Sequence, residues 1–135
     1  MIVLDASAVA DALLDAGPRG EWARTEIAAA DGLAAPHLLD VEVASVARNR
    51  ALRREVPRRR ASDAVDDLAR LRVRRYAATP LLHRIWELSG SLTAYDAVYV
   101  ALAEALGCAL VTTDLRLART PRLPVRFRIP PGAST

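Results

Sequence analysis

Short apolar segments alternate with longer amphipathic ones along the chain, which predicts strands separated by helices. Ile2 to Leu4 is too uniformly apolar to alternate and is typical of a fully buried strand. Glycine and proline mark the breaks between segments. We expect further strands at residues 33–35, 72–78 (an edge strand), 109–113 and 125–129 (the last followed by a loose end), and helices at residues 6–17, 20–31, 37–52, 58–71, 81–92, 94–107 and 115–119.

This alternation favours one domain over residues 1–135, an α/β sandwich around a mainly parallel sheet. Sites in such sheets form beyond the carboxyl ends of the strands. Asp5 and Asp114 directly follow two predicted strands and are candidates for such a site. Each also has a simpler interpretation, because an aspartate before a helix is a good N-cap.

Glu42 is a third candidate, because it lies on the same side of its predicted helix as Leu38, Leu39 and Val46. Val41 and Val43 flank this apolar stripe, whereas Asp40 lies opposite and is expected to be solvated. A buried carboxylate is costly unless it is paired or binds a metal. The alternative to a functional role is a salt bridge to one of the arginines.

Asp96 is the fourth candidate, in a helix that is apolar nearly all round and therefore central. It shares a face with Val100 and Ala103, although its spacing from Thr93 also suits a capping pair. We expect the remaining acids to be solvated and without a role: Asp11, Asp15, Asp63, Asp66 and Asp67.

The amino-acid composition limits which classes of protein this chain can belong to. The chain has a single cysteine, Cys108, and no apolar run near the roughly 20 residues that span a bilayer. No signal peptide is evident, so we expect a cytoplasmic protein. All 19 basic residues are arginines and the net charge is only +3. Arginines at positions 48–60 and 70–76 would either track RNA phosphates or form a solvated helix face.

Four acids gathered in one place would repel one another unless a cation joined them, and carboxylate oxygens suit Mg²⁺. Ser7, Thr112 and Thr113 add hydroxyls that would orient the carboxylates or bound water. Without lysine or a phosphate-binding glycine loop, the chemistry that remains is metal-assisted hydrolysis of a phosphodiester.

Three stretches resemble the PIN domain, in the subtype of VapC ribonuclease toxins from type II toxin–antitoxin systems. They are "MIVLDASA" at the start, Pro36 to Glu42, and "LTAYDAVYVALAEALGCALVTTD" from Leu92 to Asp114. The resemblance implies a three-layer α/β/α sandwich, a Mg²⁺ or Mn²⁺ centre and endonuclease action on RNA. It also implies a VapB-type antitoxin and a homodimer. Asp5, Glu42, Asp96 and Asp114 match the family acids, the fourth being the most variable, and Ser7 and Thr112 match its hydroxyl positions.

Two other functions stay open. An aspartate-dependent phosphotransferase also places acids at strand ends, but it normally needs a lysine, which this chain lacks. A catalytically silent PIN domain would keep the fold and only bind RNA or a protein. Activity in the presence of Mg²⁺ and its loss with a chelator would separate an enzyme from such a binding module.

Overall fold

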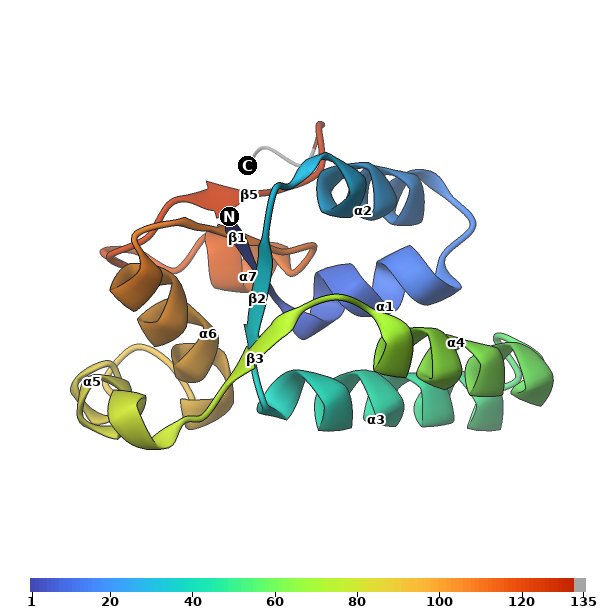
Figure 1. Cartoon of the computed structure of the whole chain (residues 1–135), viewed down its shortest axis with the longest axis horizontal. Coiled ribbons are helices and arrows are strands. Elements are labelled where there is room, and N and C mark those ends of the chain that lie inside the picture. The colour runs from blue at the N-terminus through green and yellow to red at the C-terminus, as the bar shows by residue number, and fades with distance from the viewer. Residues whose placement is uncertain (133–135) are drawn as a thin grey trace.

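A computed structural model describes residues 1–132 and shows five parallel strands with helices on both sides (Figure 1). The strand order is β3-β2-β1-β4-β5, and each neighbouring pair is parallel. The strands are β1 (Ile2–Leu4), β2 (Leu33–Pro36), β3 (Arg74–Tyr76), β4 (Ala109–Val111) and β5 (Phe127–Arg128). The predicted three-layer α/β/α sandwich is therefore confirmed. The last residues of the tail predicted to be loose lie outside the described residues.

The helices form the two outer layers. They are α1 (Ala6–Leu14), α2 (Pro18–Ala29), α3 (Leu38–Leu52), α4 (Arg58–Arg70), α5 (Leu82–Glu87), α6 (Ala94–Leu106) and α7 (Leu115–Ala118), with a short 3-10 turn, η1 (Thr79–Leu81). In Figure 1, α5 and α6 lie to the left of the sheet and α1 to α4 to its right. Helix α6 packs directly on β1, β2 and β4, which explains why it is apolar nearly all round.

The central strands β1 and β4 carry the core. Val3, Leu4, Leu110 and Val111 are fully buried, because both faces of the sheet are covered. Leu4 pairs with Val111, and the ladder continues one step further, since the Asp5 amide donates to the Val111 carbonyl at 3.0 Å. The chain segments that follow β1 and β4 therefore start side by side, at the carboxyl ends of these two strands.

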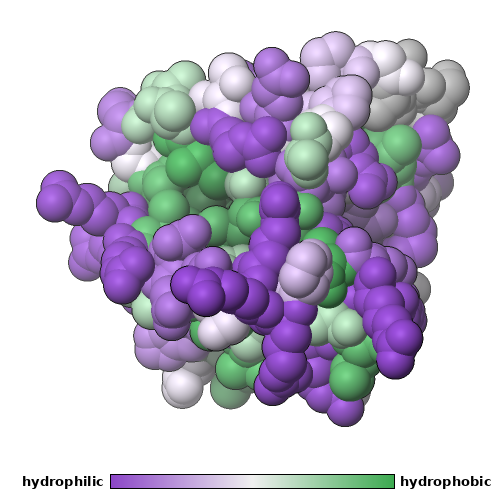
Figure 2. All heavy atoms as spheres, turned by 90° about the vertical axis from the view of Figure 1, so that its right-hand side faces the viewer, coloured by the Kyte–Doolittle hydropathy of each residue, from purple (hydrophilic) through white to green (hydrophobic). Residues whose placement is uncertain are grey.

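A second, smaller hydrophobic cluster joins α1, α3 and α4 through Leu14, Ala47, Ala61 and Ala64. It extends the molecule beyond the sheet, toward the right-hand end of Figure 1. Figure 2 faces that end and shows hydrophilic side chains projecting around a hydrophobic hollow.

Several predicted element boundaries are wrong. The helix expected at residues 81–92 ends at Glu87, because Leu88 to Ser91 turn back on themselves, with the Ser89 amide donating to the Trp86 carbonyl at 3.0 Å. Helix α2 starts at Pro18 instead of residue 20, since proline is well suited to a first helical position. The edge strands β3 and β5 are also shorter than predicted.

Across residues 1–132, every helix is too short or too polar to cross a membrane.

Candidate active site

One cavity of about 290 Å³ brings together all four acids singled out from the sequence. Asp5 follows β1, Glu42 lies in α3, Asp96 lies in the first turn of α6, and Asp114 precedes α7. The lining is completed by small or apolar side chains, namely Ala6, Ser7, Ser45 and Val46. The cavity lies beyond the carboxyl ends of β1 and β4, where a parallel sheet is expected to form its site.

Asp5 is buried, and its side chain does not cap α1 although it occupies the N-cap position. Its Oδ2 accepts hydrogen bonds from Ser7 Oγ at 2.6 Å and Thr112 Oγ1 at 2.7 Å. Burial raises the pKa of Asp5, the two hydroxyl donors oppose that shift, and the charges of Asp114 and Asp96 add to it. The capping interpretation is therefore wrong for Asp5, whose side chain accepts hydrogen bonds from the two hydroxyls instead of the helix amides.

The hydroxyls of Ser7 and Thr112 join the start of α1 to the end of β4. Their oxygens lie 3.0 Å apart, and Ser7 Oγ also accepts the Thr113 amide at 3.1 Å. Thr112 Oγ1 accepts the Asp114 amide at 2.9 Å, which fixes the backbone that carries Asp114. Both hydroxyls therefore lie beside the acids and position two of them.

Glu42 lies at the edge of the buried stripe of α3 and not at its centre. The buried residues of this helix are Leu39, Val43 and Ala47, whereas Val41 is 69% exposed. The expected apolar arc is therefore only partly buried: Leu39 is buried, Leu38 and Val46 are half-buried, and the flanking Val41 is exposed.

The partner of Glu42 is the Tyr99 hydroxyl, which donates to Oε1 at 2.6 Å, and not an arginine. Partial burial raises the pKa of Glu42, the Tyr99 hydrogen bond lowers it, and the charges of Asp5 and Asp96 raise it further. Tyr99 is itself almost fully buried, and burial together with its contact to Glu42 raises the pKa of its hydroxyl. The phenol therefore stays protonated and remains a donor.

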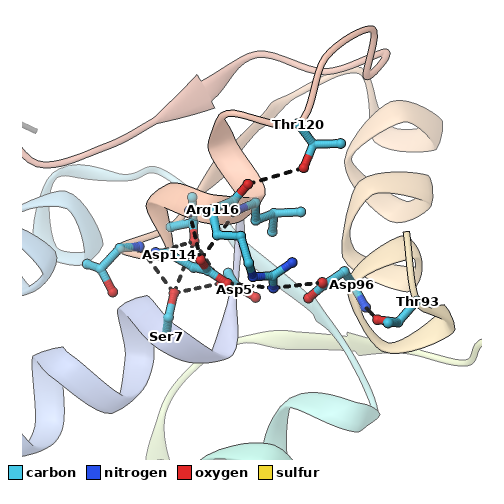
Figure 3. Close-up of polar contacts among 10 residues, drawn as sticks. Asp5, Ser7, Thr93, Asp96, Asp114, Arg116 and Thr120 are labelled. Carbon is cyan, nitrogen blue, oxygen red and sulfur yellow. Dashed lines mark hydrogen bonds and ion pairs between the residues drawn. The ribbon is translucent and has the colours of Figure 1, made fainter. Parts of the chain in front are cut away.

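Asp96 and Asp114 share one partner, the guanidinium of Arg116 (Figure 3). Arg116 Nη2 lies 3.0 Å from Oδ2 of Asp96 and 3.0 Å from Oδ2 of Asp114. Contact with the two acids raises the pKa of Arg116 still further, with the hydrogen bond to Asp96 as the main cause. This guanidinium offsets part of the negative charge at the mouth of the cavity.

The capping alternatives hold in part for these two acids. Asp114 Oδ1 accepts the amides of Arg116 and Leu117 at 3.0 and 3.3 Å, so this carboxylate does cap α7. In α6 the cap is Thr93, whose hydroxyl accepts the Asp96 amide at 3.3 Å. The Asp96 carboxylate takes no part in that cap and faces the cavity instead.

The donor chemistry of the cavity fits a hard divalent ion, because carboxylate and hydroxyl oxygens are the ligands that Mg²⁺ prefers. The present arrangement is not a ready-made cage: within residues 1–132, no three acid, histidine or cysteine side chains are grouped so as to hold a metal. Binding an ion would therefore require side-chain movement, most directly at the two acids that contact Arg116.

Asp11 and Asp40, both expected to be solvated, are in fact paired with arginines from other elements. Asp11 is only 3% exposed; it accepts the Thr113 hydroxyl at 2.7 Å and Arg50 Nη2 at 3.0 Å. Asp40 accepts hydrogen bonds from Nε and Nη2 of Arg75, at 2.7 and 3.0 Å. Both expectations were wrong because periodicity places a residue on a helix face but does not show which arginine packs there.

Comparison with known proteins places this chain in a family. The family model for the PIN domain matches residues 2–123. The chain belongs to the PIN domain family. Within the family it is a VapC-type PIN domain: VapC ribonuclease Mb0985 from Mycobacterium bovis is 48% identical over 120 residues, which cover 89% of this chain and 91% of that protein.

Solved structures agree with this PIN fold. VapC20 of Mycobacterium tuberculosis, a sarcin-ricin loop cleaving toxin, has a TM-score of 0.69 at 19% identity, covering 93% of this chain and 99% of that one. VapBC2 of Rickettsia felis, bound to a DNA fragment from its promoter, gives 0.62 at 12% identity, with coverage of 96% and 98%. At these identities the likeness shows the fold alone.

Proposed function

We propose that this VapC-type PIN domain is a metal-dependent endoribonuclease toxin that cuts RNA phosphodiester bonds. The observation that carries the proposal is the convergence of Asp5, Glu42, Asp96 and Asp114 on one cavity at the carboxyl ends of β1 and β4. The proposal is supported by a relative named as a VapC ribonuclease, which is 48% identical over most of the chain.

Asp5, Glu42, Asp96 and Asp114 would hold Mg²⁺ or Mn²⁺, directly or through water. When bound, the ion lowers the pKa of water and offsets negative charge on the phosphate. Ser7 and Thr112 both donate to Oδ2 of Asp5, which leaves Oδ1 for a ligand in the cavity. Tyr99 holds Oε1 of Glu42 in the same way and leaves Oε2. The three hydroxyls would thus determine which oxygen of Asp5 and which oxygen of Glu42 is available to the ion.

The arginine-rich segments divide into two groups, and only one of them suits an RNA-binding role. Arg50 and Arg75 pair with acids and Arg60 donates to the Leu14 carbonyl, so these three stabilise the fold. Arg58 and Arg59, by contrast, are exposed in the first turn of α4. We propose that exposed arginines of this second kind contact RNA phosphates.

The proposal includes a VapB-type antitoxin that neutralises the toxin, and a homodimer. The Rickettsia felis structure is of a VapBC2 complex, which supports an antitoxin partner for a chain of this type. Several large apolar side chains are exposed on this chain and would be available to a protein partner: Val41, Leu82, Trp86 and Tyr95.

Replacing Asp96 tests the proposal directly. Asp96→Asn keeps the shape of the side chain but removes the charge that a cation needs, so we expect RNA cleavage to fall at least about a hundredfold. Cleavage of total cellular RNA with Mg²⁺, with and without a chelator, measures this. Circular dichroism should show an intact fold, since Asp96 is not the capping side chain of α6.

Asp66→Asn is the matched control, because Asp66 is exposed on α4 away from the cavity. Full activity in folded Asp96→Asn protein would remove Asp96 from the mechanism. If the wild-type chain binds RNA but does not cleave it with either metal, the silent binding module is the correct function.

A further inference from the structure

Arg116 is the basic side chain that contacts the acidic cavity, and its contacts conflict with metal binding. One nitrogen, Nη2, lies 3.0 Å from both Asp96 Oδ2 and Asp114 Oδ2. Both oxygens of Asp114 are therefore occupied, since Oδ1 already accepts two backbone amides of α7. A cation that binds Oδ2 of Asp114 therefore competes with the guanidinium for the same oxygen.

Departure of Arg116 from this position is sterically simple. Its side chain is 69% exposed, whereas those of Asp96 and Asp114 are 20% and 29% exposed, so it lies over the acids from the solvent side. Exposed ion pairs contribute little to stability. An ion with two positive charges attracts the acids more strongly than one guanidinium does, and therefore competes well for them.

A displaced Arg116 cannot go far, because it is only two residues after Asp114 and its backbone belongs to α7. Its guanidinium would stay at the mouth of the cavity, where a phosphate over the acids would lie. The planar guanidinium can donate two parallel hydrogen bonds to the oxygens of one phosphate. It also stays protonated at neutral pH, so its positive charge is always present.

We infer that Arg116 is a cation exchanged for the metal: it holds Asp96 and Asp114 together in the metal-free protein, and once displaced it binds the RNA phosphate. This inference rests on the proposed function and assigns a substrate-binding role to a residue outside the four acids. Removal of the Arg116 side chain should therefore raise the affinity for metal and lower the affinity for RNA.

Metal binding tests the first half without any need for activity. In titration calorimetry with Mn²⁺, Arg116→Ala should bind about threefold to tenfold more tightly than wild type, because the competing cation is gone. Arg119→Ala is the control, since Arg119 is also exposed, follows the same short helix and removes the same charge. Equal affinities for the two variants would overturn the exchange.

RNA binding tests the second half. Fluorescence anisotropy with a short RNA is measured in Ca²⁺, a hard cation with oxygen ligands, and again in chelator, with RNA integrity checked on a gel. In Ca²⁺, Arg116→Ala should bind RNA about threefold to tenfold more weakly than Arg119→Ala, and its salt slope should be smaller by about one. In chelator the difference between the two variants should shrink, because Arg116 is then bound to the acids and not to phosphate.

The outcomes separate this inference from the proposed function. If neither wild type nor Arg116→Ala binds Mn²⁺, the metal-dependent function and the exchange both fail. If wild type binds Mn²⁺ and cleaves RNA but Arg116→Ala matches Arg119→Ala in both titrations, only the role of Arg116 is wrong. An intermediate Mn²⁺ affinity for Arg116→Lys would support the exchange, because lysine keeps the charge without the planar fork.

Discussion

At the residue scale, single hydrogen bonds decide which oxygens of the acidic side chains are available. Ser7 and Thr112 both bind Oδ2 of Asp5, and Tyr99 binds Oε1 of Glu42. These donors come from α1, the end of β4 and α6, so the acids are oriented by groups that belong to the rigid frame of the domain. The raised pKa values of Asp5 and Glu42 show that burial still dominates over these donors.

Tyr99→Phe isolates one of these hydrogen bonds. The Tyr99 hydroxyl lowers the pKa of Glu42, so its removal should raise that pKa further. Glu42 must be ionised to hold a cation, and a higher pKa keeps it protonated up to higher pH. The acidic limb of the pH profile of RNA cleavage should therefore move to higher pH, with a loss of roughly tenfold in rate below that limb.

Cleavage rates from about pH 5 to pH 9 would measure this shift. Stability should change by only about 1 kcal/mol, because phenylalanine keeps the buried ring. An identical pH profile for Tyr99→Phe and wild type would show that the hydroxyl does not act on Glu42. A large drop in stability would assign Tyr99 to packing instead.

The residue scale is also where the sequence was least informative. In the sequence, Tyr99 is one more position of a helix that is apolar nearly all round, and Arg116 is one of 19 arginines. The signal for Arg116 was present, since a residue two positions after a capping aspartate lies in the first turn and close to that carboxylate. Periodicity alone, however, does not show that Asp96 comes from another helix to meet the same guanidinium.

At the element scale, the end of α1 and the start of α2 approach each other closely at Gly20. Gly20 donates its amide to Asp15 Oδ2 at 2.8 Å. A Cβ atom added at Gly20 would lie 1.9 Å from the Asp15 carbonyl oxygen and 2.7 Å from that of Asp11. Both obstacles are backbone atoms, so they cannot rotate away.

Gly20→Ala should therefore destabilise the protein by about 3 kcal/mol and lower the melting temperature by roughly 10 °C. Gly90→Ala is the matched control, because a Cβ at Gly90 meets nothing within 4 Å; it should be neutral or slightly stabilising. Urea denaturation of both variants measures the difference. Equal stabilities would mean that α2 shifts away from α1 at little cost.

The order and type of the main elements were predictable, since uniform apolar runs and proline or glycine breaks mark them. Boundaries were not predictable where the chain turns without a strong break, as after Glu87. The burial of Asp11 was missed for a related reason. Asp11 in α1 pairs with Arg50 in α3, and this pairing depends on how the two helices pack against each other.

At the scale of the whole molecule, the small net charge of +3 hides an uneven distribution. Negative charge gathers in the cavity, whereas Arg58 and Arg59 are exposed at the start of α4. If such arginines contact RNA, they raise affinity by releasing counterions, which makes binding depend on salt.

Arg58→Glu with Arg59→Glu should weaken RNA binding about tenfold and reduce the salt slope by about one to two, because each RNA phosphate that is no longer neutralised lowers the slope by about 0.7. Anisotropy titrations in an Asp96→Asn background would measure binding without cleavage. The fold should tolerate the change, because glutamates suit the first turn of a helix.

Arg122→Glu with Arg126→Glu carries the same charge change at exposed positions near β5 and serves as the control. A salt slope that responds equally to both double variants would mean that only net charge matters. RNA would then have no preferred path across the arginines of α4.

The strand order has a consequence for how the chain would acquire activity during synthesis. Strand β4 lies next to β1 inside the sheet, yet it is made from residues 109–111, late in the chain, and Asp114 comes later still. A ribosome-bound fragment that ends before β4 has neither a complete sheet nor an enclosed cavity. Under the proposed function, docking of this one strand against β1 is therefore the folding event that turns a harmless nascent polypeptide into a molecule able to cut RNA.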